Sequence, residues 1–323
     1  MAVSFYSQVA ANRRNSILLA IAVVGVLGLL GLAVGYAWTG SVDGAVGTTT
    51  LALVAGSFAS VLSYFGGDRL VLGISGAHEV DESSAPQLMN IVRELSIAAG
   101  IPMPRTYLID DTAPNAFATG RDPRHASIAV TRGLLEKLDR EELSGVIAHE
   151  LAHVRNLDIR FSLLVGVLVG TIALLADLFL RFTFWGGHGR RDRDHGGGGL
   201  QAFIFVVAIL LAILAPIAAK LVQLAVSRQR EYLADASSVE LTRNPYGLER
   251  ALAIIGSDTE PLEAANRATQ HLYFANPIKK LGEGASRLFS THPPIVDRVN
   301  RLRTLTGEAP LTAGELRALA GLE

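Results

Sequence analysis

Two histidines and a glutamate fall within the five consecutive residues His149-Glu150-Leu151-Ala152-His153. On an α-helix, residues four positions apart project from the same face, so the two histidines can hold one metal ion between them. Glu150 lies beside them on the helix, where its carboxylate can accept a proton from water. The pattern predicts metal-assisted hydrolysis. The competing interpretation is a chance match on an ordinary amphipathic helix.

The residues around this pattern favour a helix. Asp139 and Glu142, three positions apart, are typical of a capping box at a helix start. An apolar stripe at helical spacing follows, made of Leu143, Ile147, Leu151 and Val154. The histidines lie roughly opposite this stripe, so packing in a core does not explain them.

A catalytic zinc site needs three protein ligands and one open position. The extended pattern that ends in Gly and His is excluded, because Asn156 and Ile159 stand at those places. Charged residues surround the motif, so it does not lie inside an apolar span. The third ligand is therefore expected on a second helix, and Glu231 is the best candidate, with Asp235 on the same face to orient a ligand histidine. The alternative for Glu231 is an exposed charged helix that follows an apolar run.

Composition limits the class of protein. Half of the 323 residues are hydrophobic, and the mean hydropathy is +0.34, which is too apolar for an ordinary soluble protein. The net charge of −1 and the lack of a recognition motif give no reason to expect nucleic acid as a partner. Without cysteine, any metal must be held by His, Asp or Glu.

The distribution of apolar runs predicts a mainly α membrane protein with a soluble part built from two chain segments. Arginines before the first span and charges after the second place both outer ends in the cytoplasm. The soluble part contains a helix and a small sheet, expected at Pro86–Ala99 and at Arg105–Ile109, Asn115–Thr119 and Ser127–Thr131. The expected divisions are residues 1–66 (two membrane helices), 67–160 (first soluble segment), 161–226 (a hydrophobic hairpin with a Gly-rich loop at 186–199) and 227–323 (second soluble segment).

One acid interrupts the third apolar run. Asp177 lies four residues before Arg181, and we expect an interfacial ion pair between them in preference to a proton relay. Arginines in the Gly-rich loop leave open whether the hairpin crosses the bilayer fully.

Together, His149-Glu-Leu-Ala-His153-Val-Arg-Asn-Leu-Asp158 and Arg230-Glu231-Tyr-Leu-Ala-Asp235-Ala resemble the HtpX-type membrane metalloproteases of the M48 peptidase family. The resemblance covers nearly the whole chain. It implies a gluzincin-like α+β protease domain with one Zn²⁺ per chain, bound by His149, His153 and Glu231. It also implies Glu150 as the general base and Asp235 behind a ligand. The implied activity is cleavage of damaged membrane proteins and unfolded polypeptides, by a multi-pass protein of the inner (plasma) membrane whose protease domain is cytoplasmic.

Two weaker elements accompany the paired motifs. Asn115, Ala116 and Phe117 belong to a candidate edge strand that binds an extended substrate by strand addition, although a plain strand is equally compatible. His292, stiffened by two following prolines, is a candidate to stabilise the oxyanion, with a loop or capping role as the alternative.

Two other functions are compatible with membrane spans. A non-catalytic zinc-binding scaffold is disfavoured, because structural zinc sites usually have four ligands, often cysteines. A channel or transporter with Asp177 and Lys220 as pathway charges is disfavoured by the large soluble portion. The sequence gives no indication of oligomeric state or cleavage preference.

Overall fold

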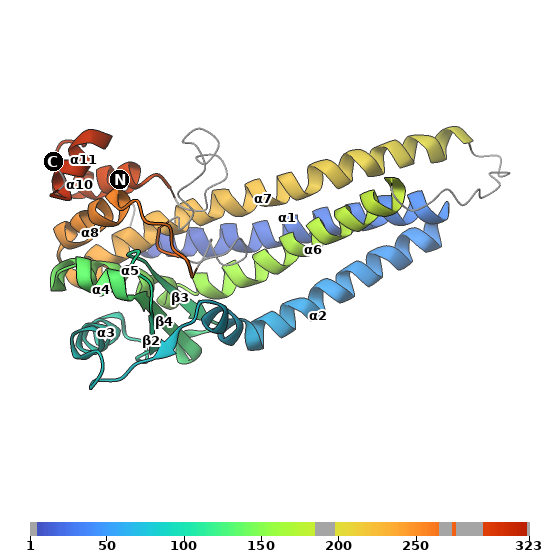
Figure 1. Cartoon of the computed structure of the whole chain (residues 1–323). Coiled ribbons are helices and arrows are strands. Elements are labelled where there is room, and N and C mark those ends of the chain that lie inside the picture. Colours follow the sequence, from blue (N-terminus) through green and yellow to red (C-terminus); the bar gives the residue numbers. More distant parts are fainter. Residues whose placement is uncertain (1–4, 185–197, 265–272, 276–292, 322–323) are drawn as a thin grey trace. The chain divides into compact units, whose positions relative to one another are not determined.

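The computed structural model describes residues 5–184, 198–264, 273–275 and 293–321 (Figure 1). As predicted, it is mainly helical with one small sheet. Its principal helices are α1 (Phe5–Thr39), α2 (Val42–Ile74), α3 (Pro86–Ala99), α4 (Arg132–Lys137), α5 (Arg140–Arg155), α6 (Asp158–Phe184), α7 (Gly198–Thr242), α8 (Pro245–Ser257), α10 (Ile295–Thr306) and α11 (Ala313–Leu319). The strands are β1 (His78–Glu79), β2 (Arg105–Ile109), β3 (Ala116–Gly120) and β4 (Ala126–Thr131), with a 3₁₀ turn at Pro123–His125.

The chain divides into two compact units. The bundle unit consists of residues 13–63 and 163–225, and the sheet unit consists of residues 1–12, 64–162 and 226–323. The two soluble segments expected from the sequence therefore lie in one unit, although 63 residues of the bundle unit separate them in the chain.

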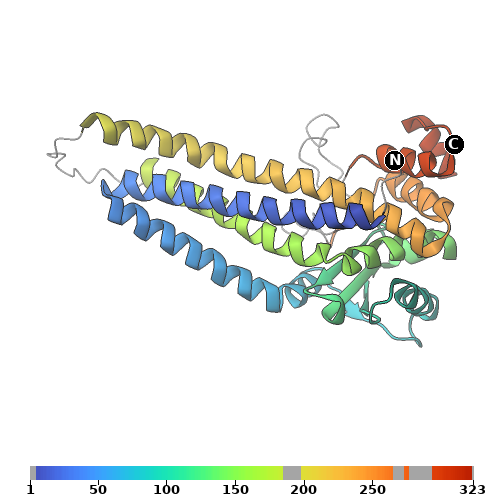
Figure 2. The same cartoon turned by 180° about the vertical axis from the view of Figure 1, so that it is seen from behind.

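The bundle unit is formed by stretches of α1, α2, α6 and α7 that run side by side (Figures 1 and 2). Its core contains Val23, Leu27, Leu30, Ile172, Phe179 and small alanines of α7. Three stretches of the described residues are long and apolar enough to cross a membrane: Ile21–Thr39, Val42–Ala59 and Ala202–Leu221. Helix α6 covers the predicted third apolar run, and its expected ion pair is confirmed, with 2.6 Å between Arg181 Nε and Asp177 Oδ2.

The sheet has the strand order β1-β2-β4-β3, which leaves β3 at one edge. Strands β2 and β4 are parallel, and β3 pairs antiparallel with β4. Because side chains alternate along a strand, the two faces have different cores. Ala116, Ala118 and Ile128 face the core shared with α3 and α5, whereas Phe117 and Ala129 face the core that contains Leu72 and Tyr273.

Helix α5 begins with the expected capping box. Asp139 Oδ1 accepts a hydrogen bond from the Glu142 N–H, and Glu142 Oε2 accepts one from the Asp139 N–H, each at 2.9 Å. The helix contacts α3, β3 and α8, so it is buried on the face of the histidines as well as on the apolar stripe. The sequence suggested a helix with one free face. In the structure, α8 and the sheet cover that face.

Glycines allow α5 and α8 to approach each other closely. A Cβ at Gly145 would lie 2.7 Å from the backbone nitrogen of Leu248, and one at Gly247 would lie 2.6 Å from the carbonyl oxygen of Glu141. Ser238 of α7 donates a hydrogen bond of 2.7 Å to the Gly145 carbonyl oxygen. The helix that carries the histidines is therefore held against α8 by backbone contact, and α7 is bound to it.

Substitution of Gly145 tests this packing. Gly145→Ala is expected to lower the free energy of unfolding by about 1–3 kcal/mol, because the added methyl group meets backbone that cannot rotate away. Gly73→Ala on α2 is the matched control, since a Cβ there meets nothing within 4 Å and alanine favours helix. Thermal unfolding in detergent, followed by circular dichroism, compares the two variants. Equal midpoints for both would contradict this account of the crossing.

Candidate metal centre

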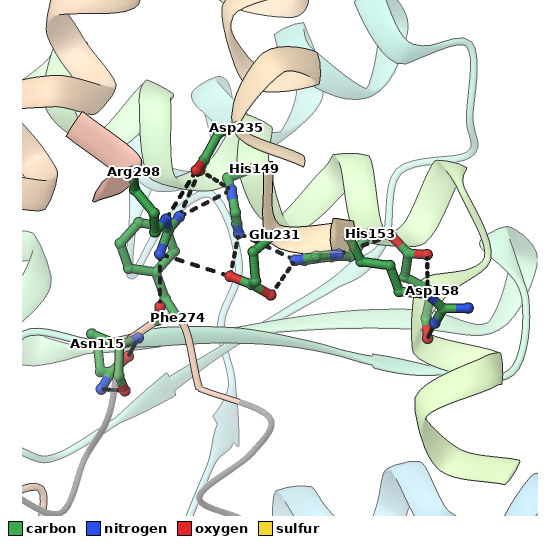
Figure 3. Close-up of polar contacts among 10 residues, drawn as sticks. Asn115, His149, His153, Asp158, Glu231, Asp235, Phe274 and Arg298 are labelled. Carbon is green, nitrogen blue, oxygen red and sulfur yellow. Dashed lines mark hydrogen bonds and ion pairs between the residues drawn. The ribbon is translucent and has the colours of Figure 1, made fainter. Parts of the chain in front are cut away.

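Three side chains from two helices converge in the sheet unit (Figure 3). Helix α5 supplies His149 and His153, and α7 supplies Glu231. The two Nε2 atoms are 3.1 Å apart, and the Glu231 carboxylate lies 3.6 Å from His149 Nε2 and 3.4 Å from His153 Nε2. One potential ligand atom from each residue lies within 4.8 Å of the others.

The other ring nitrogen of His149 faces a carboxylate. Its Nδ1 lies 2.9 Å from Asp235 Oδ1, and the guanidinium of Arg298 binds both oxygens of the same carboxylate, at 2.6 and 3.0 Å. Burial alone would raise the pKa of Asp235, but the charge of Arg298 and the hydrogen bonds from His149 and Arg298 outweigh it and lower this pKa. Arg298 has donors only, so the Nδ1 proton of His149 must point to Asp235.

His153 has a similar arrangement on its Nδ1 side. Asp158 Oδ2 lies 3.1 Å from that nitrogen, and Arg230 holds Asp158 through its carboxylate at 3.3 Å and its carbonyl oxygen at 3.2 Å. Burial lowers the pKa of Arg230 to about 10, opposed by the charge of Asp158. Burial would also lower the pKa of His153, but hydrogen bonds to Asp158 and Glu231 and the charges of both carboxylates raise this pKa well above its usual range.

These contacts determine which atoms are available for a metal. With both Nδ1 protons directed to aspartates, each Nε2 presents a lone pair, and the two lone pairs face each other and the Glu231 carboxylate. Acceptors in such an arrangement repel one another unless a cation lies between them. Two imidazole nitrogens and one carboxylate form a ligand set that zinc favours, so the residues fit the metal that the sequence predicts.

Glu150 lies beside this group and is 2 % exposed. Burial raises the pKa of its carboxyl group; the two histidines oppose this effect, Glu231 reinforces it, and a hydrogen bond from the Ala118 backbone also opposes it. A carboxylate whose pKa is raised toward neutrality is a better general base than an ordinary glutamate. The position and environment of Glu150 suit proton transfer.

The edge strand β3 lies next to Glu150 and is partly occupied by the chain itself. The Asn115 side chain accepts a hydrogen bond from the Ala275 N–H at 3.2 Å and donates one to the Ala275 carbonyl oxygen at 3.1 Å. The Phe274 N–H donates to the Ala116 carbonyl oxygen at 2.7 Å. Tyr273–Ala275 therefore lies along the beginning of the strand edge.

The structure thus places the other predicted residues as follows. The side chain of Ala116 faces the α5 side of the sheet, whereas the ring of Phe117 packs against Tyr273 on the opposite side, with ring centroids 5.1 Å apart. His292 lies outside the described residues, as does the Gly-rich loop up to residue 197.

Four residues around the ligands were given no role from the sequence: Asp158, Arg230, Phe274 and Arg298. The Phe274 ring packs edge-on against His149, with centroids 4.9 Å apart, and Arg298 lies over the same ring at 4.6 Å. Asp158 and Arg230 belong to the two motifs, so their proximity to the ligands was a usable signal. For Arg298, in a helix 63 residues after Asp235, the sequence contains no comparable signal.

Comparison with known proteins agrees with this geometry. Residues 82–306 match the model of peptidase family M48. Curated relatives described as "Protease HtpX homolog" include one from Ligilactobacillus salivarius, 44 % identical over 92 % of this chain and 98 % of its own. Another, from Streptococcus gordonii, is 44 % identical over 93 % and 99 %.

A solved structure is also similar, although more distantly. The crystal structure of S. mikatae Ste24p matches with a TM-score of 0.45 at 18 % identity, covering 91 % of this chain and 65 % of that one, a likeness too distant to bear on the site. The family match covers more than half of the chain, and the curated relatives match nearly all of it. The chain belongs to peptidase family M48 and is a membrane metalloprotease.

Proposed function

We propose that the protein is a zinc-dependent endopeptidase that cleaves misfolded or damaged membrane proteins at the cytoplasmic face of the plasma membrane. The observation that carries the proposal is the convergence of His149, His153 and Glu231 next to a buried Glu150. Within the described residues, the group contains three ligands, which is the number typical of catalytic zinc and fewer than the four typical of structural zinc. This count argues against the alternative of a non-catalytic zinc-binding scaffold.

In this proposal His149, His153 and Glu231 hold the zinc ion. A bound zinc ion supplies Lewis-acid activation of the substrate carbonyl group and of water. Asp235 fixes the tautomer of His149, so that its Nε2 always faces the metal position.

Glu150 carries out the proton transfers. Its carboxylate accepts the proton of the attacking water and passes it to the leaving amine. The backbone hydrogen bond from Ala118 keeps the carboxylate beside the edge of β3, where a peptide bond has to lie. A water-poor environment, indicated by the burial of Glu150, strengthens its interaction with developing charge.

We infer that β3 binds the substrate by strand addition. Phe117 pairs with Ala129 toward β4, so the backbone groups of Ala116 and Ala118 point to the outer edge. Ala275 and Phe274 occupy the Asn115–Ala116 end, so the substrate backbone is expected along the edge from Ala118 toward Gly120. Asn115 then acts by holding Ala275, which limits how far the substrate extends. His292 remains our candidate for stabilising the oxyanion.

The membrane orientation is part of the proposal. Arg13 and Arg14 before the first span, and Arg69 after the second, favour the cytoplasm for the ends that flank these spans. A protease domain on that side has access to unfolded polypeptide segments, which provide the extended backbone that strand addition requires.

Metal removal tests the proposed function. The detergent-purified protein is expected to cleave casein and a denatured membrane protein, to lose cleavage on treatment with a zinc chelator, and to regain it when zinc is added back. Folded casein-free controls, such as a compact globular protein, should be cleaved poorly, because they offer no extended strand. Cleavage that persists at full rate without metal would contradict the proposal. Metal binding without any cleavage would favour the scaffold.

A further inference from the structure

The two ligand histidines are held from behind by two separate carboxylate–arginine pairs. For His149 the pair is Asp235 and Arg298, and for His153 it is Asp158 and Arg230 (Figure 3). The second pair is the subject of this inference, which rests on the proposed zinc site.

Asp158 connects its two neighbours with different oxygen atoms. Its Oδ2 lies 3.1 Å from His153 Nδ1, and its Oδ1 lies 3.3 Å from Arg230 Nε. Arg230 also donates from Nη1 to the Asp158 carbonyl oxygen at 3.2 Å, so the arginine holds both the side chain and the backbone of this residue. Asp158 is 3 % and Arg230 is 5 % exposed, which removes the pair from the screening that weakens surface ion pairs.

The place of the pair in the chain is distinctive. Asp158 is the first residue of α6, and Leu157 immediately before it has a φ of +59°, a left-handed conformation that leucine rarely adopts. Arg230 lies on α7, one residue before the ligand Glu231. The pair therefore connects the turn at which the ligand helix α5 ends with the helix that supplies the third ligand.

A buried ion pair by itself stabilises a fold only weakly, because desolvation of both charges offsets their attraction. A purely structural role would also not require Asp158 to face an imidazole nitrogen. The strained turn at Leu157 brings the carboxylate to that nitrogen, at a cost of about 1–3 kcal/mol for such a backbone conformation. Strain of this kind persists where the surrounding contacts determine it, and those contacts are Arg230 and His153.

We propose that Asp158 and Arg230 are positioning residues that act through His153 and set the metal affinity of the site. Arg230 fixes the Asp158 carboxylate, and this carboxylate fixes the tautomer and the ring plane of His153, so that its Nε2 points toward His149 and Glu231. The metal affinity therefore depends on the register between the start of α6 and α7 at this level.

The test measures zinc affinity by competition with a chromogenic chelator, on the full-length protein in detergent. Asp158→Asn is expected to weaken zinc binding by about 10- to 100-fold, the usual effect of removing a partner behind a ligand histidine. Arg230→Lys keeps the charge but cannot reach both oxygens in the same way, so a smaller loss is expected. Arg155→Gln is the matched control: Arg155 also lies near His153, but its Nη2 pairs at 3.1 Å with the exposed Glu240, and unchanged affinity is expected.

A double variant separates positioning from simple stability. Asp158→Asn combined with Arg230→Gln removes both charges, so the unfolding midpoint of the metal-free protein should recover relative to Asp158→Asn alone. Under the proposal, zinc affinity stays weak in the double variant, and the visible absorption of the Co²⁺-loaded form differs from that of the wild type. If zinc affinity recovers together with stability, the pair is only structural and the inference is overturned.

The outcomes distinguish this inference from the proposed function. If the wild type binds no zinc, the proposed function itself fails. If the wild type binds zinc and Asp158→Asn binds it within about twofold as tightly, only the positioning role is refuted, since removal of such partners ordinarily costs at least about tenfold. If Asp158→Asn does not fold, Arg230→Lys provides the same comparison with the charge retained.

Discussion

Glu150→Gln is expected to lower kcat for casein or a denatured membrane protein by about 10²- to 10⁴-fold, the range contributed by a positioned general base. Glutamine has nearly the same shape as glutamate, and its carbonyl oxygen can still accept the hydrogen bond from Ala118. It cannot accept a proton, so the chemical step is lost while the fold and the three metal ligands remain.

The assay for this prediction measures cleavage rate and zinc content on the same preparation. KM and zinc content should stay close to those of the wild type, because the substitution removes an interaction that acts in the transition state. Glu136→Gln is the control: Glu136 is an exposed glutamate of α4. Its substitution should leave kcat unchanged. If Glu150→Gln retains more than about a tenth of wild-type activity, Glu150 is not the general base.

Arg298→Met is expected to lower the free energy of unfolding by about 3–5 kcal/mol, because it leaves the buried Asp235 without its ionic partner. Arg298 is 1 % exposed and binds both oxygens of Asp235 and the Phe274 carbonyl oxygen. Its loss also frees Tyr273–Ala275 from α10, so the edge of β3 should become less well defined.

Two comparisons make the Arg298 prediction specific. Arg301→Met, three residues along α10, removes a cation that lies 4.4 Å from the Tyr232 ring centroid and is exposed, so a loss of about 1 kcal/mol or less is expected. Combining Arg298→Met with Asp235→Asn should restore part of the stability, since the buried negative charge is then gone. If Arg298→Met and Arg301→Met unfold at the same midpoint, the Asp235–Arg298 pair does not carry the energy assigned to it.

Local signals in the sequence predict much of the fold. Helix Pro86–Ala99 has the predicted bounds, because proline suits the first turn and Gly100 ends the helix with a φ of +66°. Strand Arg105–Ile109 also matches, and the other two strands differ from the prediction by one residue at an end. The two-residue strand His78–Glu79 was missed, since it is too short to show alternation.

The metal site was predictable to the extent that its ligands lie in local patterns. His149, His153 and Glu231 are in recognisable motifs, and the structure brings the three together. Asp158 is different, because its role depends on a break in the helix at Leu157. A left-handed leucine cannot be anticipated from its type, which ordinarily continues a helix.

Arg298 shows a second limit. An arginine on an amphipathic helix is normally exposed, and no spacing rule connects it with Asp235 on α7. Only tertiary packing of α10 brings the two together. The same holds for Phe274, whose contact with His149 depends on the path of the chain between α8 and α10.

The zinc content of the purified wild type and of Glu231→Ala tests the central claim most directly. The account predicts one zinc ion per chain in the wild type and a large loss in the variant, because two histidines alone leave the cation without its carboxylate ligand. An exposed glutamate of the same helix, Glu240, provides the control as Glu240→Ala. Undiminished zinc stoichiometry in Glu231→Ala would contradict the assignment of α5 and α7 as the two halves of one metal centre.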